Sequence, residues 1–409
     1  MFTRGAFLEQ KKEPALSSDI ELFDTPDYVY IPLMEERKHV TEKNFNTSRL
    51  SPLYIPDDPE EAKVYPGIGG FYKEDVSLTG PDGKARSYAR INLIDHLPQK
   101  SLPAFPLYDI TPDDIISLAY EYGVRDELDG VSLHVKLRKM REQNVSLVIG
   151  DAMEDQPLVS SRTALVLQRT DEVVKGLELA QKAVGASSGE VWFYGEMGDI
   201  RSKIPRQYRD APFRRPSIPY PAKYNLVLRG RAKENQFIGV GALYHLYRAA
   251  AYHRPHNTCF LTVGGDCIAA PVNVEAPIGT PLHQLLVFGG ISEEPARVVM
   301  GGAMTGVCVD NLSLPVTCTT TSLYAFYDRA PSRYLECCGC GKCVSICPAG
   351  LLPYALYKNS RSGRWEACAR FGVKDCIECG LCSYICASRV NLVEHIKNAK
   401  QALEGGEAL

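Results

Sequence analysis

The chain has 409 residues, of which 45% are hydrophobic and 23% charged, and its formal net charge is −3. This length and apolar content predict roughly two to four globular domains. The small net charge argues against nucleic acid or an anionic membrane surface as a partner, and no apolar run approaches the roughly 18 residues of a membrane span. Because 14 cysteines occur without a secretory signal at the start, we expect a cytoplasmic protein that meets a membrane only through a partner.

The first part of the chain, residues 1–105, is rich in Pro, Asp, Glu and Tyr and has no long helical period. Alternation of apolar and polar residues predicts short strands at 28–33 and near 87–93. The glycine-rich stretch at 66–71 predicts a loop, because no strand and helix flank it as a phosphate site would require. We therefore expect a small, irregular β module.

Strands and helices alternate in the second part, residues 106–255. A helix is predicted to begin after Thr111, since a threonine cap is followed by proline and then by two aspartates that face the positive helix end. The alternation predicts a mostly parallel sheet covered by helices. Its other expected elements are strands at 145–149 and 191–194 and a helix over 170–185 with Thr170 as its cap.

The remaining chain divides into two further parts. Residues 256–330 predict a compact module of short strands with one short helix, and residues 331–409 are rich in cysteine and close with a helix over 390–403. Within the second part lies a basic segment at 200–215. We interpret it as a solvated loop, with a docking surface for an acidic redox protein as the alternative.

Eight of the cysteines form two matching tetrads with the spacing C-x2-C-x2-C-x3-C. In this bacterial ferredoxin pattern, three thiolates of a tetrad hold one 4Fe–4S cluster and the fourth thiolate holds the other cluster. Small residues inside the loops let backbone amides turn toward the sulfur atoms. The spacing therefore predicts one cluster bound by Cys337, Cys340, Cys343 and Cys386, and a second bound by Cys376, Cys379, Cys382 and Cys347.

Other uses of these cysteines fit the pattern less well. Structural zinc sites use two CxxC pairs with a longer gap, and a disulfide framework requires a secreted protein. Cys338 and Cys368 lie out of phase with the tetrads and are predicted not to be ligands. The other four cysteines lie in apolar or small-residue stretches and are expected to act as small hydrophobic side chains.

These motifs resemble the RnfC family, the iron–sulfur subunit of ferredoxin–NAD oxidoreductase complexes, whose soluble relatives include the cobalamin reductase of propanediol microcompartments. The paired tetrads carry most of the resemblance, with LLP at 351–353 after the first and SR at 388–389 after the second. GGD at 264–266, PIGTP at 277–281 and GGAMTG at 301–306 resemble the family's β-grasp module, termed SLBB.

The resemblance implies an α/β and α+β multidomain fold. It implies a Rossmann-type domain at 106–255, like the 51 kDa flavin subunit of respiratory complex I, and an SLBB module at 256–330. Residues 331–409 would form a helical two-cluster ferredoxin domain, and residues 1–105 a remnant of the family's barrel-sandwich module.

Family members bind FMN and NADH through a loop resembling GxGGAGFPTHVKL. The corresponding stretch, 123–137, keeps Gly130 and the final HVKL but has Arg125, Glu127 and Leu128 at glycine positions, interleaved with two aspartates. Side chains there block the approach of backbone amides to a phosphate, and carboxylates repel it. The loop therefore predicts a pocket that has lost its dinucleotide.

A second family motif, which ends a strand with a sequence like NGAECEP, is also altered. The stretch 150–157 keeps Glu154 but has Asp151 where the family has asparagine, and Arg162 stands where the family usually has an acid. If FMN or NADH binds nevertheless, the resemblance implies Lys136, Asp151 and Glu154 as the contacts.

Three functions follow as hypotheses. The first is an electron-transfer subunit of a hetero-oligomeric complex, which relays electrons through two clusters between a ferredoxin, flavodoxin or flavoprotein donor and a reductase or membrane complex, without an NADH site of its own. The second is an FMN-containing NADH oxidoreductase that reduces ferredoxin or cobalamin. The third is a redox-sensing scaffold. Each would act in the cytoplasm, beside a membrane complex or inside a microcompartment, and the direction of electron flow stays open.

Overall fold

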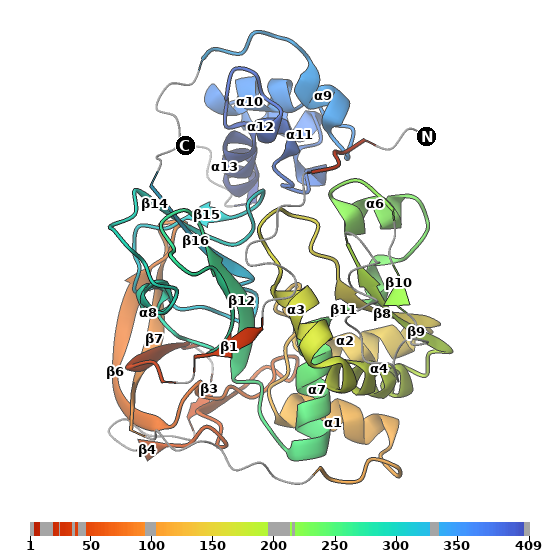
Figure 1. Ribbon diagram of the computed structural model, residues 1–409. Coiled ribbons are helices and arrows are strands. Elements are labelled where there is room, and N and C mark those ends of the chain that lie inside the picture. Colours follow the sequence, from red (N-terminus) through yellow and green to blue (C-terminus); the bar gives the residue numbers. More distant parts are fainter. Residues whose placement is uncertain are drawn as a thin grey trace.

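The computed structural model describes residues 4–8, 19–23, 25–34, 37–39, 46–94, 104–194, 213–214, 217–327 and 335–404. The chain has a mixed α/β multidomain fold, with β-rich, α/β and helical parts side by side (Figure 1). Among the described helices, none combines the length and the apolar character needed to cross a membrane. The predicted basic segment at 200–215 lies outside the described residues except for strand β10 (Phe213–Arg214).

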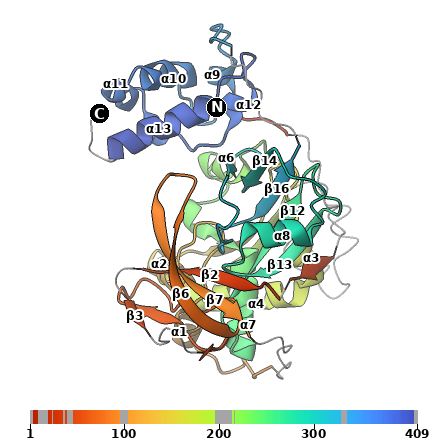
Figure 2. The same cartoon turned by 90° about the vertical axis from the view of Figure 1, so that its left-hand side faces the viewer.

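The N-terminal part forms an antiparallel sheet in the order β2-β7-β6-β4 and a two-stranded pair β3-β5. The expected strands at 28–33 and 87–93 are confirmed as β2 and β7. The long β6–β7 hairpin, visible as a curved ribbon in Figure 2, was not predicted, because three exposed charged residues interrupt the alternation within β6. The strands are β2 (Tyr28–Pro32), β3 (Arg37–His39), β4 (Asn46–Thr47), β5 (Tyr54–Pro56), β6 (Gly70–Thr79) and β7 (Ala85–Leu93).

The α/β part contains a sheet in the order β10-β9-β8-β11, and all three strand pairings are parallel, as predicted. Helices α1, α2, α4 and α7 pack on one face of this sheet, in the largest apolar core. Helix α6 packs on the opposite face of the sheet. The elements are α1 (Pro112–Glu121), α2 (Leu133–Glu142), β8 (Leu147–Ala152), α3 (Ser161–Gln168), α4 (Thr170–Val184), β9 (Ser188–Phe193), α6 (Ala222–Leu228), η2 (Glu234–Gln236), β11 (Phe237–Gly239) and α7 (Val240–Tyr252).

The two predicted helix caps differ in outcome. Thr111 and Asp114 form a capping box at the start of α1, as the sequence indicates. Thr170 is the first residue of α4 and not its cap, because its hydroxyl donates to the carbonyl of Val166 at 2.7 Å in the helix before it. Helices α3 and α4 follow each other with Arg169 alone between them, so no extended residue is available to accept from the amides of α4.

The second β-rich part is a sheet in the order β1-β13-β12-β16-β14-β15, with helix α8 packed against it. Its edge strand β1 comes from the N-terminal segment and pairs in parallel with β13. A strand of only three residues is too short for its sequence to predict this pairing. This sheet shares one core with β2, β6 and β7. The elements are β1 (Ile20–Leu22), β12 (Thr258–Gly264), β13 (Val272–Pro277), α8 (Leu282–Phe288), β14 (Arg297–Met300), β15 (Val307–Cys308) and β16 (Ser322–Phe326).

Short helices make up the cysteine-rich C-terminal part, which lies at one end of the molecule above α6 and the β14–β16 region (Figures 1 and 2). The closing helix expected over 390–403 is confirmed as α13. A separate apolar core holds this part together and includes cysteines of both tetrads. The elements are α9 (Lys342–Ile346), α10 (Pro353–Arg361), α11 (Trp365–Arg370), η3 (Val373–Asp375), α12 (Leu381–Tyr384) and α13 (Leu392–Glu404).

Candidate functional site

The eight tetrad cysteines surround two separate cavities in the C-terminal part. Each cavity takes three cysteines from one tetrad and the fourth cysteine of the other tetrad. Among the described residues, no three His, Cys, Asp or Glu side chains are grouped closely enough to hold a single metal ion. The first cavity is lined by Cys376, Cys379, Cys382 and Cys347, and the second by Cys337, Cys340, Cys343 and Cys386.

Both cysteine loops turn into a short helix through a glycine in the left-handed conformation. Gly341 has φ 73° before α9, and Gly380 has φ 80° before α12. This backbone conformation is costly for residues with a Cβ atom. The turn brings the third cysteine of each tetrad, Cys343 or Cys382, into the first helical turn beside its cavity.

Backbone amides donate to two of the cysteine sulfur atoms. The amide of Glu378 donates to Cys376 Sγ and the amide of Val390 to Cys386 Sγ, both at 3.4 Å. Lys400 of α13 fixes the loop around Cys376 by donating to its carbonyl at 2.6 Å and to the Glu378 carboxylate at 2.8 Å. These contacts orient the sulfur atoms and supply the type of hydrogen bond that raises the potential of a bound cluster.

The first cavity adjoins the rest of the protein. The Tyr220 hydroxyl donates to the carbonyl of Cys379 at 2.7 Å, and Leu381 packs with Tyr220 and Met304 in a small apolar cluster. A Cβ atom on Gly380 would lie 2.3 Å from the carbonyl oxygen of Met304. The second cavity is lined by the exposed Cys340, so the two cavities face different surroundings.

We expect Gly380→Ala to weaken the contact between the cysteine-rich part and the rest of the chain. The added methyl group would have to displace the Met304 backbone, which costs about 1–3 kcal/mol. Gly341→Ala is the matched control, because Gly341 has a similar φ but no atom within 4 Å of the added Cβ. Thermal unfolding and limited proteolysis should show a larger loss for Gly380→Ala, and equal losses would show that only the backbone conformation matters.

The cysteines outside the tetrads occupy other environments. Cys368 is fully buried, and its sulfur lies 3.6 Å from the carbonyl of Leu356. Cys338 is exposed and lines the second cavity beside the predicted ligands. No disulfide joins any of the 14 cysteines, all of which lie in the described part of the chain.

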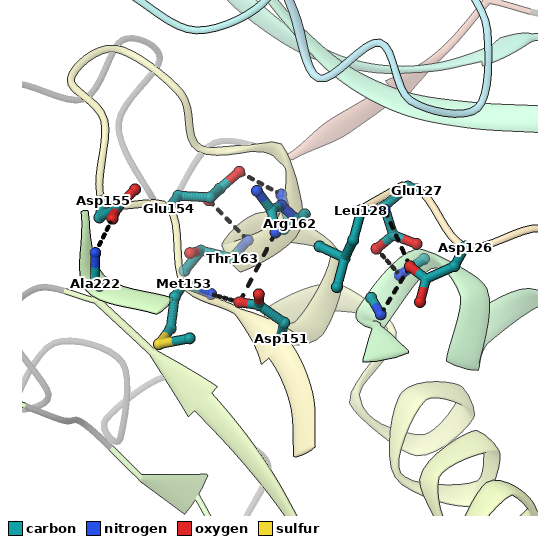
Figure 3. A network of polar contacts seen from close by, with 12 residues as sticks. Asp126, Glu127, Leu128, Asp151, Met153, Glu154, Asp155, Arg162, Thr163 and Ala222 are labelled. Carbon is teal, nitrogen blue, oxygen red and sulfur yellow. Dashed lines mark hydrogen bonds and ion pairs between the residues drawn. The ribbon is translucent and has the colours of Figure 1, made fainter. Parts of the chain in front are cut away.

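The loop that resembles the family's glycine-rich loop is closed by its own carboxylates (Figure 3). Glu127 accepts from the amides of Gly241 at 2.7 Å and Ala242 at 2.8 Å, at the start of α7. A Cβ on Gly239 would lie 2.1 Å from the Glu127 carboxyl carbon, so a larger residue there would displace the Glu127 side chain. The carboxylate thus lies where the free amides and dipole of a helix N-terminus attract an anion.

Asp126 reinforces this closure. Its carboxylate accepts from the amide of Gly239 at 3.0 Å and from Lys136 Nζ at 2.5 Å. Lys136 also donates to Asp129 at 2.9 Å, so two carboxylates of the loop neutralise it. Arg125 points elsewhere and pairs with Glu61 of the N-terminal part.

The second altered motif forms a neighbouring network at the start of α3 (Figure 3). Glu154 accepts from the amides of Arg162 at 2.8 Å and Thr163 at 3.1 Å. Asp151 accepts from the amide of Met153 at 2.8 Å and lies 3.8 Å from the Arg162 guanidinium. Glu154 therefore caps α3, and Arg162 compensates a buried carboxylate.

Burial changes the ionisation of this region. Loss of solvent and the neighbouring Asp126 raise the pKa of Glu127 to about 7, against the opposing effect of Arg162. Burial likewise raises the pKa of Asp151. His256 lines the cavity beside Glu127, accepts from the Arg125 amide at 3.0 Å, and has its pKa lowered to about 3 by burial.

Each of the three predicted flavin contacts interacts with other residues of the protein. Lys136 lies between two aspartates, Asp151 beside Arg162, and Glu154 at the cap of α3. Sequence reasoning missed the role of Glu127, because its acceptor geometry depends on amides more than 110 positions later. It also missed Tyr220, whose contact with Cys379 spans 159 positions.

Several known proteins are similar in sequence to this chain over much of its length, although no protein-family model matches it. The RnfC-type subunit of the Na+-translocating ferredoxin:NAD+ oxidoreductase complex of Acetobacterium woodii is 28% identical over 331 residues, which cover 76% of this chain and 74% of that protein. The corresponding subunit of an ion-translocating oxidoreductase complex from Serratia proteamaculans is 26% identical over 87% of this chain and 52% of the relative. The chain resembles RnfC. The resemblance predicted from the motifs is thereby confirmed.

The RnfC-like chain matches its relatives over different shares of their length. The matching protein of Pseudomonas aeruginosa is 28% identical over 56% of this chain but only 32% of that relative. Among solved structures, an NAD+-reducing nickel–iron hydrogenase in the H2-reduced state is similar, with a TM-score of 0.49 and 16% identity over 75% of this chain and 63% of that chain.

Proposed function

We propose that the chain is an electron-relay subunit of an RnfC-like oxidoreductase complex, with two 4Fe–4S clusters and without a working FMN or NADH site. The observation that carries the relay is the division of the eight tetrad cysteines between two cavities, each with four tetrad thiols. Four thiolates are the ligand set of a 4Fe–4S cluster, which transfers single electrons. The donor set and the amide contacts to sulfur therefore fit such clusters.

The proposed parts follow from the resemblance and the fold. We assign residues 331–409 to a two-cluster ferredoxin domain and 256–330, together with β1, to an SLBB-like β-grasp module. Residues 106–255 correspond to the flavin-binding domain of the family, and 1–105 to its N-terminal β module. The loop at 301–306 links the β-grasp module to the cysteine-rich part, because the Met304 backbone contacts Gly380 and leaves no space for a larger residue there.

The absence of a dinucleotide site rests on the filled loop. An FMN phosphate held by the amides at the start of α7 would have to displace the Glu127 carboxylate, and two aspartates lie next to it. The three candidate contacts Lys136, Asp151 and Glu154 already have partners within the protein. The residues therefore do not fit FMN in the manner of the family, which favours the relay over an NADH oxidoreductase.

The two cavities give the relay an inner and an outer end. The cavity with Cys379 adjoins Tyr220 and Met304 of the body, whereas the cavity with Cys340 has exposed cysteines at its edge. A redox protein that docks on the loop at 337–341 would reach the outer cluster directly. We propose this loop as the contact for the ferredoxin, flavodoxin or membrane-complex partner.

An anaerobic titration of cluster-replete protein tests the function. We expect NADH to leave the visible absorbance unchanged, flavin to be missing from the same sample, and reduced ferredoxin or dithionite to bleach the clusters. Bleaching by NADH in a sample that contains flavin would establish the oxidoreductase instead. Assembly of the complex that depends on this chain, with electron flux independent of its clusters, would favour the redox-sensing scaffold.

A further inference from the structure

A cleft lined by four arginines lies where the three larger parts of the chain meet. It encloses about 300 Å³, at the lower end of the range for small-molecule sites. Its lining differs from that of the closed loop at Glu127, since it contains neither Glu127 nor Arg162. The arginines come from four separate places in the sequence, and the lining includes Arg49, Arg169, Arg248, Arg254, Tyr244 and Glu275.

The fold brings these arginines together from different elements. Arg49 follows β4 of the N-terminal sheet, Arg169 separates α3 from α4, Arg248 belongs to the last turns of α7, and Arg254 follows that helix. The carboxylate comes from Glu275 on β13. A site at such a junction depends on all three parts being in place.

The cleft has more positive than negative charge. Glu275 lies 4.0 Å from the Arg248 guanidinium and also accepts from the Thr258 hydroxyl at 2.9 Å. Arg248 in turn donates to the Tyr244 hydroxyl at 2.6 Å. Among the described residues of the lining, there are four guanidinium groups and one carboxylate. The resulting field concentrates anions in the cleft.

Burial makes this charge costly. Arg254 is only 9% exposed, and burial together with the nearby Arg248 lowers its pKa. Like charges that are held close together in a partly desolvated cleft repel each other more strongly than in water. An anion with several charges would relieve this repulsion, whereas a neutral ligand would not.

We propose that this arginine cleft binds a small molecule with two or more linked phosphate groups. Guanidinium groups match phosphate oxygens in pairs, with two parallel N–H donors for each phosphate. A diphosphate offers more oxygen atoms and more negative charge to the four guanidinium groups than a single phosphate does. The site is independent of the proposed electron relay, because it contains none of the tetrad cysteines.

Calorimetric titration of the full, cluster-replete chain with pyrophosphate tests the proposal. We expect saturable binding at constant ionic strength, at least tenfold tighter than the binding of inorganic phosphate. Arg169→Gln should weaken it about tenfold or more, since each lost charge-assisted contact has an effect of that size. Arg169 is exposed, so its replacement leaves the fold intact.

Two further variants sharpen the result. Arg169→Lys should retain part of the affinity, and Arg229→Gln, which removes an exposed arginine outside the cleft, should bind as the wild type does. Circular dichroism verifies the fold of each variant. No saturable binding by the wild type, or the same affinity in Arg169→Gln and Arg229→Gln, would overturn the proposal.

Discussion

Cys386→Ala is expected to disable the cluster of the first tetrad, although Cys386 belongs to the second. The side chain lines the cavity that contains Cys337, Cys340 and Cys343, and the Val390 amide donates to its sulfur at 3.4 Å. Loss of one of four thiolate ligands leaves an iron without its protein ligand. We expect the variant to lose about half of the bound iron and sulfide and to abolish electron transfer.

The matched variant is Cys347→Ala, which should disable the cluster of the second tetrad although Cys347 belongs to the first. Cys347 lies in the first tetrad but lines the cavity with Cys376, Cys379 and Cys382. Electron paramagnetic resonance of the reduced protein should therefore pair Cys347→Ala with Cys379→Ala, and Cys386→Ala with Cys340→Ala. If the spectra pair by tetrad instead, the crossed assignment is wrong.

Cys368→Ala tests the same ligand assignment with a cysteine that belongs to neither tetrad. Cys368 is buried in the apolar core of the cysteine-rich part and lines neither cavity. Its replacement removes one sulfur from that core and should cost about 1 kcal/mol or less of stability. Both clusters should remain, as measured by iron content. Equal damage from Cys368→Ala and Cys379→Ala would contradict the ligand set.

The predictions from sequence succeeded mostly where the signal was local, although the cap predicted at Thr170 is wrong. The parallel sheet and the cap at Thr111 depend on residues a few positions apart, and each is confirmed. The spacing of the tetrads also led to an assignment of ligands, which stays a prediction. The pairing of β1 with β13 and the contact of Tyr220 with Cys379 bridge distant parts of the chain, so no local pattern contains them.

The chemistry of the altered loop at 123–137 could also be predicted only in part from the sequence. From the sequence, the carboxylates of the loop predicted repulsion of a phosphate. The structure adds that Glu127 itself accepts from the amides of α7, and that Asp126 accepts from Gly239 and Lys136. The loss of glycines alone would leave the amides at the start of α7 without an acceptor. In this loop the Glu127 carboxyl group is the acceptor for these amides.

Glu127→Gly is expected to reopen the anion site at the start of α7. The variant loses two hydrogen bonds from the amides of Gly241 and Ala242, which should cost about 2 kcal/mol of unfolding free energy. Added inorganic phosphate should raise the unfolding midpoint of the variant, because the freed amides can donate to a phosphate oxygen in place of the carboxylate. The rise should exceed that of the wild type, in which phosphate reaches only the arginine cleft, and thermal unfolding measures both shifts.

The cost of Glu127→Gly should depend on pH in a defined direction. Burial and Asp126 raise the pKa of Glu127 from 4.5 to about 7 in the folded chain. Its stabilising contribution is therefore fully present below about pH 4.5 and declines as the pH rises through 7. Urea unfolding should show a loss about 1–2 kcal/mol larger at pH 5.5 than at pH 8.

Glu127→Gln separates an anion site from a mere loss of packing. Glutamine fills the same space and keeps one acceptor oxygen for the amides of Gly241 and Ala242, so it excludes phosphate as the native side chain does. We expect it to lack this additional phosphate effect, whereas its difference in stability from the wild type should keep the pH dependence expected for Glu127→Gly, because both variants lose the titrating carboxyl group. Stabilisation of both variants by phosphate to the same extent would place the anion elsewhere. Because Arg125 and Leu128 still stand at glycine positions of the family loop in Glu127→Gly, NADH should still fail to reduce the clusters of this variant.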